Sequence, residues 1–322
     1  MAEMLRCSAA ARVYRRSRYA GPVPFQEEKY CKREAQGTGD KDMRIYRIRS
    51  YEEFVAHAAR NKTASDQHQS YLRKITPLEQ VPFTVPGYSY TAGRQVDFLV
   101  DFQHSGNSGQ VNWRERVCCP KTYFNNRMRA TFHLFDLEMA PYPDSRIYLT
   151  EQVTPIYSYF ADRFPGTVGS EFLGDHLPLG SVDENGVRNE TLCALSFPDR
   201  TFDILISLDV LEHIPEYELA FGECARVLRD GGRMMWSVPF IPSSRCNIVR
   251  AKIENGQIVH ILPPEYHGDP LSSDGVLCFQ HFGWEMLGQM RNAGFRDVYA
   301  LCYQSSEFGY LGGEQFIFVA IK

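Results

Sequence analysis

The sequence lacks two features that would assign it to common functional classes. None of its apolar runs approaches the ~18–20 residues that a helix needs to cross a bilayer, so no membrane span is expected. Basic residues are not in excess, because 35 Lys and Arg stand against 39 Asp and Glu, a formal net charge of −4. A general nucleic-acid binder needs a basic surface that releases counterions, so a nucleic-acid partner is not expected either.

The cysteines show no paired pattern. There are nine of them, an odd number, and most lie inside apolar stretches. This usage fits reduced core thiols in a cytoplasmic protein better than a disulfide framework. Hydrophobic residues make up 43% of the chain and charged residues 23%, which is typical of a globular protein with a sizeable core.

Composition along the chain predicts three parts. Residues 1–42 begin with crowded arginines and continue without an apolar period, so we expect a poorly ordered extension, with a transit peptide as the alternative. Residues 43–140 form a small helical and ribbon-like module, with a helical pattern over 43–80 and short extended pieces from 82 to 126. Residues 141–322 form the main domain, with an insertion at about 241–280 that contains a hairpin turn at Asn255-Gly256.

From residue 146 onwards, strand and helix patterns alternate. This alternation predicts an α/β fold with a doubly wound, mostly parallel, seven-stranded, Rossmann-like sheet. A helix is expected after Pro215 and should end at Gly231-Gly232. The expected strands are Ile147–Thr150, Thr167–Phe172, Phe202–Leu208, Arg233–Val238, Val298–Tyr303 and Gln315–Ile321.

The N-terminal module contains two turns that resemble the knuckles of a zinc ribbon in degenerate form. Only Cys119 stands at a ligand position, and a structural zinc needs four ligands, so no zinc is expected there. The other three positions carry Ser89, Ala92 and Thr122. Three histidines of the main domain could in principle bind a metal, but they lack paired spacing, so no metal is expected there either: His260, His267 and His281.

The most specific pattern lies between Leu195 and Val238. It consists of a Leu-Ser-Phe-Pro-Asp loop, a strand that begins with Phe-Asp, a Leu-Glu-His turn and a helix followed by Arg-Val-Leu-Arg-Asp-Gly-Gly. This stretch resembles the class I S-adenosylmethionine-dependent methyltransferases of the ubiquinone- and menaquinone-biosynthesis type. The order of elements extends the resemblance over about residues 146–322 and implies S-adenosylmethionine as cofactor.

The resemblance also implies which residues hold this cofactor. Glu171 closes the second strand, where a carboxylate accepts hydrogen bonds from the ribose hydroxyls, although an exposed loop carboxylate is the alternative. Leu208 and Asp209 would face the methionine end, and core packing is an equal alternative for the leucines. The residues expected to flank the adenine are Thr191, Leu192 and Cys193.

The loop after the first strand departs from the family pattern because residues 147–155 contain no glycine. A glycine-rich loop lets the backbone approach the cofactor closely. Here the side chains of Thr150, Glu151 and Thr154 would bind the amino or carboxylate group instead. The alternative is a non-catalytic binding or scaffold protein that retains the fold. A nicotinamide-dependent oxidoreductase is disfavoured, since no Gly-x-Gly-x-x-Gly follows any strand.

Methyl transfer requires an in-line arrangement and, for some acceptors, a base that removes a proton. His267 and Asp269 lie in a His-Gly-Asp-Pro loop that no helical or strand period explains, so both are candidate catalytic residues. His213 is a second candidate base, with a structural role in the Leu-Glu-His turn as its alternative. The resemblance to standalone enzymes of this branch, together with the aromatic residues of the insertion, implies O-methylation of a small molecule or glycan, for which we favour a bacterial surface-polysaccharide sugar. The oligomeric state is not predicted.

Overall fold

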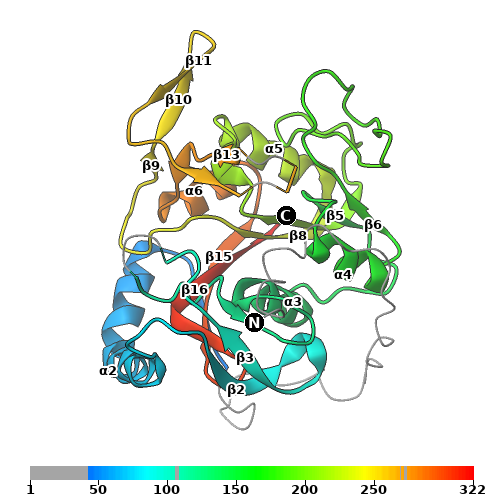
Figure 1. Ribbon diagram of the computed structural model, residues 1–322. Coiled ribbons are helices and arrows are strands. Elements are labelled where there is room, and N and C mark those ends of the chain that lie inside the picture. The colour runs from blue at the N-terminus through cyan, green and yellow to red at the C-terminus, as the bar shows by residue number, and fades with distance from the viewer. Residues whose placement is uncertain (1–42, 106–108, 269, 272–273) are drawn as a thin grey trace. The chain divides into compact units, whose positions relative to one another are not determined.

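The computed structural model describes residues 43–105, 109–268, 270–271 and 274–322 (Figure 1). The predicted extension over residues 1–42 and the candidate residue Asp269 lie outside the described residues. The chain divides into two compact units, each built from segments that are distant in sequence. The first contains Thr63–Leu134 and Tyr303–Gln315, and the second contains Tyr46–Lys62, Phe135–Cys302 and Phe316–Lys322. No helix among the described residues is long and apolar enough to cross a membrane.

The first unit is built around a three-stranded antiparallel sheet. Strands β2 (Phe83–Ser89) and β3 (Arg94–Val100) form a hairpin, and β4 (Val117–Cys118) pairs with the far end of β3. The short 3-10 helix η2 (Tyr90–Ala92) closes the hairpin and ends at Gly93, whose φ of 62° favours glycine. The core of this unit consists of Leu72, Val85, Phe98, Val100, Val111, Val117, Cys119 and Leu311.

The two turns that resemble a zinc ribbon lie close together. The hydroxyl of Ser89 donates to Cys119 Sγ at 3.2 Å, and the hydroxyls of Thr91 and Thr122 are also 3.2 Å apart. Hydroxyl and thiol groups therefore hold these turns together by hydrogen bonds. The relation of the module to a zinc ribbon stays a prediction.

A fully buried arginine links α3 (Asn126–Glu138) to the rest of the first unit. Arg129 donates to the backbone carbonyls of Phe308, Val117 and Gly309 at 2.6, 3.2 and 3.1 Å. Its guanidinium also lies 3.9 Å from the centre of the Phe98 ring. Burial lowers the pKa of Arg129 to about 10, because no water solvates the charge. Carbonyl dipoles and an aromatic face are what compensate this charge.

The seven-stranded sheet has the order β1-β15-β16-β8-β7-β5-β6. Strands β6, β5, β7 and β8 are mutually parallel, whereas β16 runs antiparallel to β8. This confirms the predicted α/β doubly wound sheet. The strands are β1 (Arg44–Ile48), β5 (Ile147–Leu149), β6 (Thr167–Gly169), β7 (Phe202–Leu208), β8 (Leu228–Ser237), β15 (Asp297–Ser305) and β16 (Tyr310–Ile321).

Two local predictions were wrong. Residues 43–80 were expected to be helical throughout, but Arg44–Ile48 forms the edge strand β1 and helix α2 covers only Tyr51–Ile75. The helix expected to end at Gly231-Gly232 is α5 (Tyr217–Val227), and β8 already begins at Leu228. The glycines instead lie in a β-bulge, where the register shifts between Phe202 and Ile204 and Gly231 has a φ of 78°.

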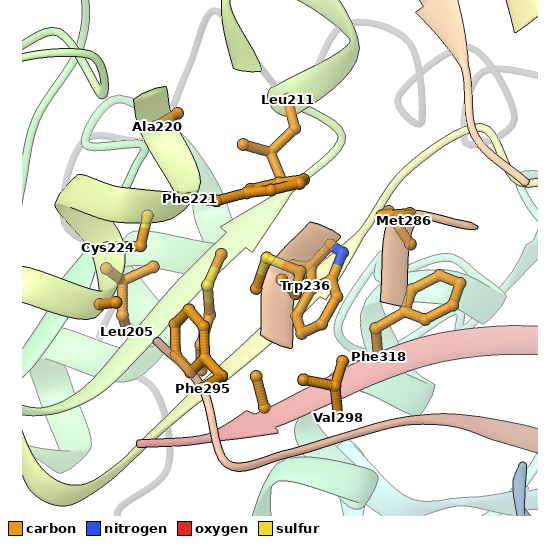
Figure 2. Close-up of a cluster of buried hydrophobic side chains, with 14 of the residues drawn as sticks. Leu205, Leu211, Ala220, Phe221, Cys224, Trp236, Met286, Phe295, Val298 and Phe318 are labelled. Carbon is orange, nitrogen blue, oxygen red and sulfur yellow. The ribbon is translucent and has the colours of Figure 1, made fainter. Parts of the chain in front are cut away.

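The main core of the second unit lies where the sheet meets α5 and α6 (Glu285–Asn292) (Figure 2). Trp236 of β8 stacks on Phe318 of β16, with ring centres 5.3 Å apart. Phe221 of α5 and Met286 of α6 are fully buried in the same cluster. Burial of such large apolar side chains stabilises a protein by roughly 1.5–3 kcal/mol each. This cluster therefore holds α5 and α6 against the sheet.

The insertion after β8 consists of short antiparallel pairs. Its hairpin β10 (Ala251–Glu254) and β11 (Gln257–His260) extends away from the other elements of this unit (Figure 1). The predicted turn is present, with φ of 50° at Asn255 and 75° at Gly256. The remaining pairs join β12 (Tyr266–His267) to β13 (Val276–Leu277) and β14 (Gln280–His281) to β9 (Ile248–Val249).

Candidate functional site

The candidate site begins where the strand order of the sheet reverses. Strands β6 and β7 lie on opposite sides of β5, and ligands of open α/β sheets bind outside the carboxyl ends of strands at such a point. Thr150, the first residue after β5, donates its backbone N–H to Ile206 and its hydroxyl to Ser207, both at 3.1 Å. The loops that follow β5 and β7 therefore start side by side.

Glu171 shapes the glycine-free loop after β5. Its Oε1 accepts hydrogen bonds from the backbone N–H groups of Gln152 at 2.7 Å and Val153 at 3.0 Å. The close approach that the loop needs comes from the neighbouring strand, since a Cβ on Gly169 would lie 2.8 Å from the Glu151 carbonyl oxygen and 2.6 Å from the Tyr157 ring. The missing side chain of Gly169, at the end of β6, therefore lets the loop after β5 pack closely against β6, although the loop itself contains no glycine.

Thr154, another predicted residue of this loop, has a structural role. It is the N-cap of α4 (Pro155–Arg163), where its hydroxyl accepts a hydrogen bond from the Tyr157 N–H at 3.2 Å. The side chain of Glu151 is half-buried at the start of the loop. Carboxylate and hydroxyl groups thus lie at the ends of β5 and β6. Such hydrogen-bonding groups fit the ribose hydroxyls and the amino-acid part of S-adenosylmethionine.

The segment predicted to flank the adenine, residues 191–193, comes directly after the residues that pair with Glu171. Glu171 donates its N–H to the Arg188 carbonyl at 2.9 Å and accepts from the Glu190 N–H at 3.0 Å. Beyond this pairing, Thr191 Oγ1 accepts from the Cys193 N–H at 3.4 Å, and burial raises the pKa of the Cys193 thiol. The segment also supplies buried Leu192, which belongs to the main hydrophobic cluster.

The end of β7 carries a strained residue. Asp209 follows buried Leu208 with a φ of 53°, in the left-handed region that non-glycine residues rarely adopt. Its N–H donates to the Ser237 carbonyl at 2.9 Å, and its Oδ1 accepts from the Ser237 hydroxyl at 2.8 Å. Hydrogen bonds to β8 therefore hold the Asp209 carboxylate at the carboxyl edge of the sheet, and strain of this kind is typical of functional sites.

A buried glutamate lies one turn further along the chain. Glu212, in the 3-10 helix η4 (Leu211–His213), is fully buried, and neither carboxylate oxygen has a hydrogen-bond partner among the described residues. Its Oε1 lies 3.5 Å from His267 Nδ1 and 3.7 Å from His213 Nε2. Burial raises the pKa of Glu212, and the neighbouring His267 opposes this shift only in part.

The structure brings the two predicted catalytic histidines together. The rings of His213 and His267 pack edge to face, with centres 5.0 Å apart. His213 Nδ1 lies 2.8 Å from the Leu277 carbonyl oxygen, which only accepts hydrogen bonds. The Nδ1 of His213 therefore carries the proton, and in the neutral ring the lone pair is on Nε2, toward Glu212.

His267 also belongs to a second group of polar side chains. Glu265 Oε1 lies 3.0 Å from both His267 Nε2 and His281 Nε2, while Arg250 lies 3.1 Å from the other oxygen of Glu265. The neighbouring Cys278, and then the carboxylates of Glu212 and Glu265, raise the pKa of His267 to about 11, against the effect of burial. Burial by itself would raise the pKa of Cys278, but hydrogen bonds with His267 and His281 lower it below its usual value.

Sequence reasoning missed the grouping of Glu212, Glu265 and Cys278. One signal was available, because Glu265 and His267 are two residues apart in an extended segment and so lie on one face. Cys278 joins them only through the pairing of β12 with β13 and through its N–H, which donates to the Glu265 carbonyl at 2.8 Å. Glu212 joins them because the Phe279 N–H donates to its carbonyl oxygen, also at 2.8 Å.

Fold and site together define an α/β protein with a mostly parallel sheet and a group of polar side chains at the carboxyl edge of that sheet. Residues 177–236 match the family model described as "Methyltransferase domain". The match confirms the resemblance deduced from the Leu195–Val238 stretch. The matched residues 177–236 thus carry part of a methyltransferase domain. No curated protein matches the chain.

Solved structures with a similar arrangement of elements share little sequence with this chain. An S-adenosylmethionine-dependent methyltransferase from Mesorhizobium loti is 15% identical, with 61% of this chain and 96% of that chain covered and a TM-score of 0.37. A protein from Listeria monocytogenes described as belonging to the same class is 10% identical, with 61% and 98% covered and a TM-score of 0.38.

Proposed function

We propose that this chain transfers a methyl group from S-adenosylmethionine to a hydroxyl of a small-molecule or glycan acceptor, with a surface-polysaccharide sugar as the acceptor we favour. The observation that carries the proposal is the group formed by Glu212, His213 and His267, just after Asp209 at the end of β7. A hydroxyl acceptor must lose its proton as it is methylated, and a histidine next to the cofactor edge of the sheet suits that task.

The cofactor-binding roles follow the strand ends. When bound, S-adenosylmethionine supplies a methyl group on a sulfonium sulfur, and the protein's task is to orient it. Glu171 would accept hydrogen bonds from the ribose hydroxyls, and the loop from Thr150 to Thr154 together with Asp209 would surround the methionine end. The residues that would line the adenine site are Thr191, Leu192, Cys193 and Leu208.

His213 is the better placed of the two candidate bases. Its Nδ1–H is held by the Leu277 carbonyl, so Nε2 of the neutral ring carries the lone pair that would accept a proton, and Glu212 at 3.7 Å would stabilise the resulting charge. Both ring nitrogens of His267 face carboxylates, those of Glu212 and Glu265. His267 would therefore hold the Glu212 carboxylate beside His213, rather than take the proton. Asp269 remains a candidate from the sequence.

The first test is calorimetric titration of the full chain with S-adenosylmethionine and with S-adenosylhomocysteine. Binding of both ligands supports the proposal, and a panel of sugars and small alcohols then identifies the acceptor through release of S-adenosylhomocysteine. His213→Asn should lower kcat with little change in cofactor affinity, whereas the exposed His260→Asn should leave both unchanged. If a well-folded chain binds neither ligand, with or without the acceptor panel, the scaffold alternative replaces this proposal.

A further inference from the structure

Four potential metal donors converge beside the acceptor side of the site. They come from a short stretch with the spacing Glu265-x-His267, ten residues, then Cys278-x-x-His281. Donor atoms of Glu265, Cys278 and His281 all lie within 4.8 Å of one another, and His267 Nε2 is 3.0 Å from the same Glu265 oxygen. Donors at zinc–ligand distances of about 2.0–2.3 Å in a tetrahedron are roughly 3–4 Å apart, and the two 3.0 Å separations from Glu265 Oε1 to His267 Nε2 and His281 Nε2 are close to that range.

From this geometry we propose that Cys278 Sγ, His267 Nε2, His281 Nε2 and a carboxylate oxygen of Glu265 bind one zinc ion. A thiolate, two imidazoles and a carboxylate are the donor types that Zn²⁺ prefers, whereas Mg²⁺ and Ca²⁺ take oxygen ligands. The sequence predicted no metal because these histidines lack paired spacing. The pairing of β12 with β13 and of β14 with β9 supplies the proximity that the spacing does not reveal.

The surroundings of the cluster give an independent argument. Glu212 is fully buried, and both of its oxygens lack a hydrogen-bond partner among the described residues, although His267 Nδ1 is only 3.5 Å away. A histidine that binds zinc through Nε2 donates its Nδ1–H, and a carboxylate is a common acceptor. A zinc ion on His267 therefore explains why a buried carboxylate faces the opposite ring nitrogen.

The carboxylate of Glu265 is also oriented toward the proposed zinc position. Its Oε2 lies 3.1 Å from Arg250 Nη2, which leaves Oε1 directed at the two histidines. Without a metal, the same residues would form a network of imidazolium, thiolate and carboxylate groups. The experiment must distinguish this metal-free network from a zinc site.

The proposed ion would have a structural consequence for the acceptor side. Glu265 and His267 lie at β12, Cys278 follows β13 and His281 lies in β14, so one ion would join all three short strands. His267 is also adjacent to His213 and Glu212 in η4. Zinc would therefore fix the inserted strands over the end of β7, where a strand pair of two residues each contributes little stability by itself.

The test uses the full chain, purified without chelator, with metal content measured by elemental analysis. We expect about one zinc ion per chain in the wild type and in the exposed-thiol control Cys246→Ser, and loss of zinc in Cys278→Ser. Replacement by Co²⁺ should produce a thiolate-to-cobalt charge-transfer band that Cys278→Ser abolishes and Cys246→Ser retains. Glu265→Gln and His267→Asn, with His260→Asn as control, give the same readout if Cys278→Ser fails to fold.

Two results would overturn the proposal. One is a folded wild-type chain that retains no zinc after incubation with Zn²⁺ and gel filtration, which would indicate the ionic network. The other is a Cys278→Ser chain that keeps the full zinc content and an unchanged cobalt spectrum. Because metal content does not depend on cofactor binding, titration with S-adenosylmethionine tests the proposed function separately.

Discussion

Replacing Glu171 by alanine tests the proposed role of this residue in binding S-adenosylmethionine beside the glycine-free loop. In the structure, one carboxylate oxygen of Glu171 holds the N–H groups of Gln152 and Val153 at 2.7 and 3.0 Å. Hydrogen bonds to a charged group contribute about 1.5–3 kcal/mol each. If Glu171 binds the ribose as proposed, loss of one such hydrogen bond should weaken S-adenosylmethionine binding by about 10- to 150-fold, since each 1.4 kcal/mol changes Kd tenfold.

The assay separates a ribose contact from a purely structural role. Glu171→Ala should lower both the thermal midpoint and the cofactor affinity, whereas Glu171→Gln keeps an acceptor oxygen for the loop and should lose affinity with a smaller loss of stability. Glu184→Ala, an exposed glutamate in the same segment, is the matched control. A Glu171→Ala chain that is less stable but binds S-adenosylmethionine with the wild-type Kd would refute the ribose assignment.

Three further predictions concern stability. Burial would raise the pKa of Asp101, but the buried Arg116, at 2.7 and 2.5 Å, lowers it, so the pair should stabilise the fold above about pH 4 and lose this effect as pH falls further. In denaturant unfolding, Asp101→Asn should lack that acid dependence, and its free energy of unfolding should be lower by about 1–3 kcal/mol at neutral pH. Arg129→Lys cannot contact three carbonyls at once and should cost about 2–4 kcal/mol in urea unfolding, so an unchanged midpoint would contradict the role given to the guanidinium. Gly169→Ala should weaken cofactor binding and lower the thermal midpoint because its Cβ meets the Tyr157 ring, while Gly222→Ala, in open space, should do neither.

Strand positions in the second unit were largely predictable because their apolar runs are bounded by polar turns. The expected strand Phe202–Leu208 is β7 itself, and those at Ile147 and Thr167 begin where β5 and β6 begin. Their order along the chain, alternating with helices, also predicts a doubly wound sheet. Local pattern failed at β1, since Arg44–Ile48 becomes a strand only by pairing at the edge of the sheet.

For the site, sequence alone identified the positions that follow strands, and tertiary structure decided which side chains meet. Glu171, Asp209 and His213 were predictable because a motif and strand ends locate them along the chain. The partners of His267 were not, because Cys278 and Glu212 reach it through strand pairing and backbone hydrogen bonds that no local period encodes. Side-chain alternation and apolar periodicity are properties of neighbouring residues, whereas a cluster of donors from separate segments exists only after the chain has folded.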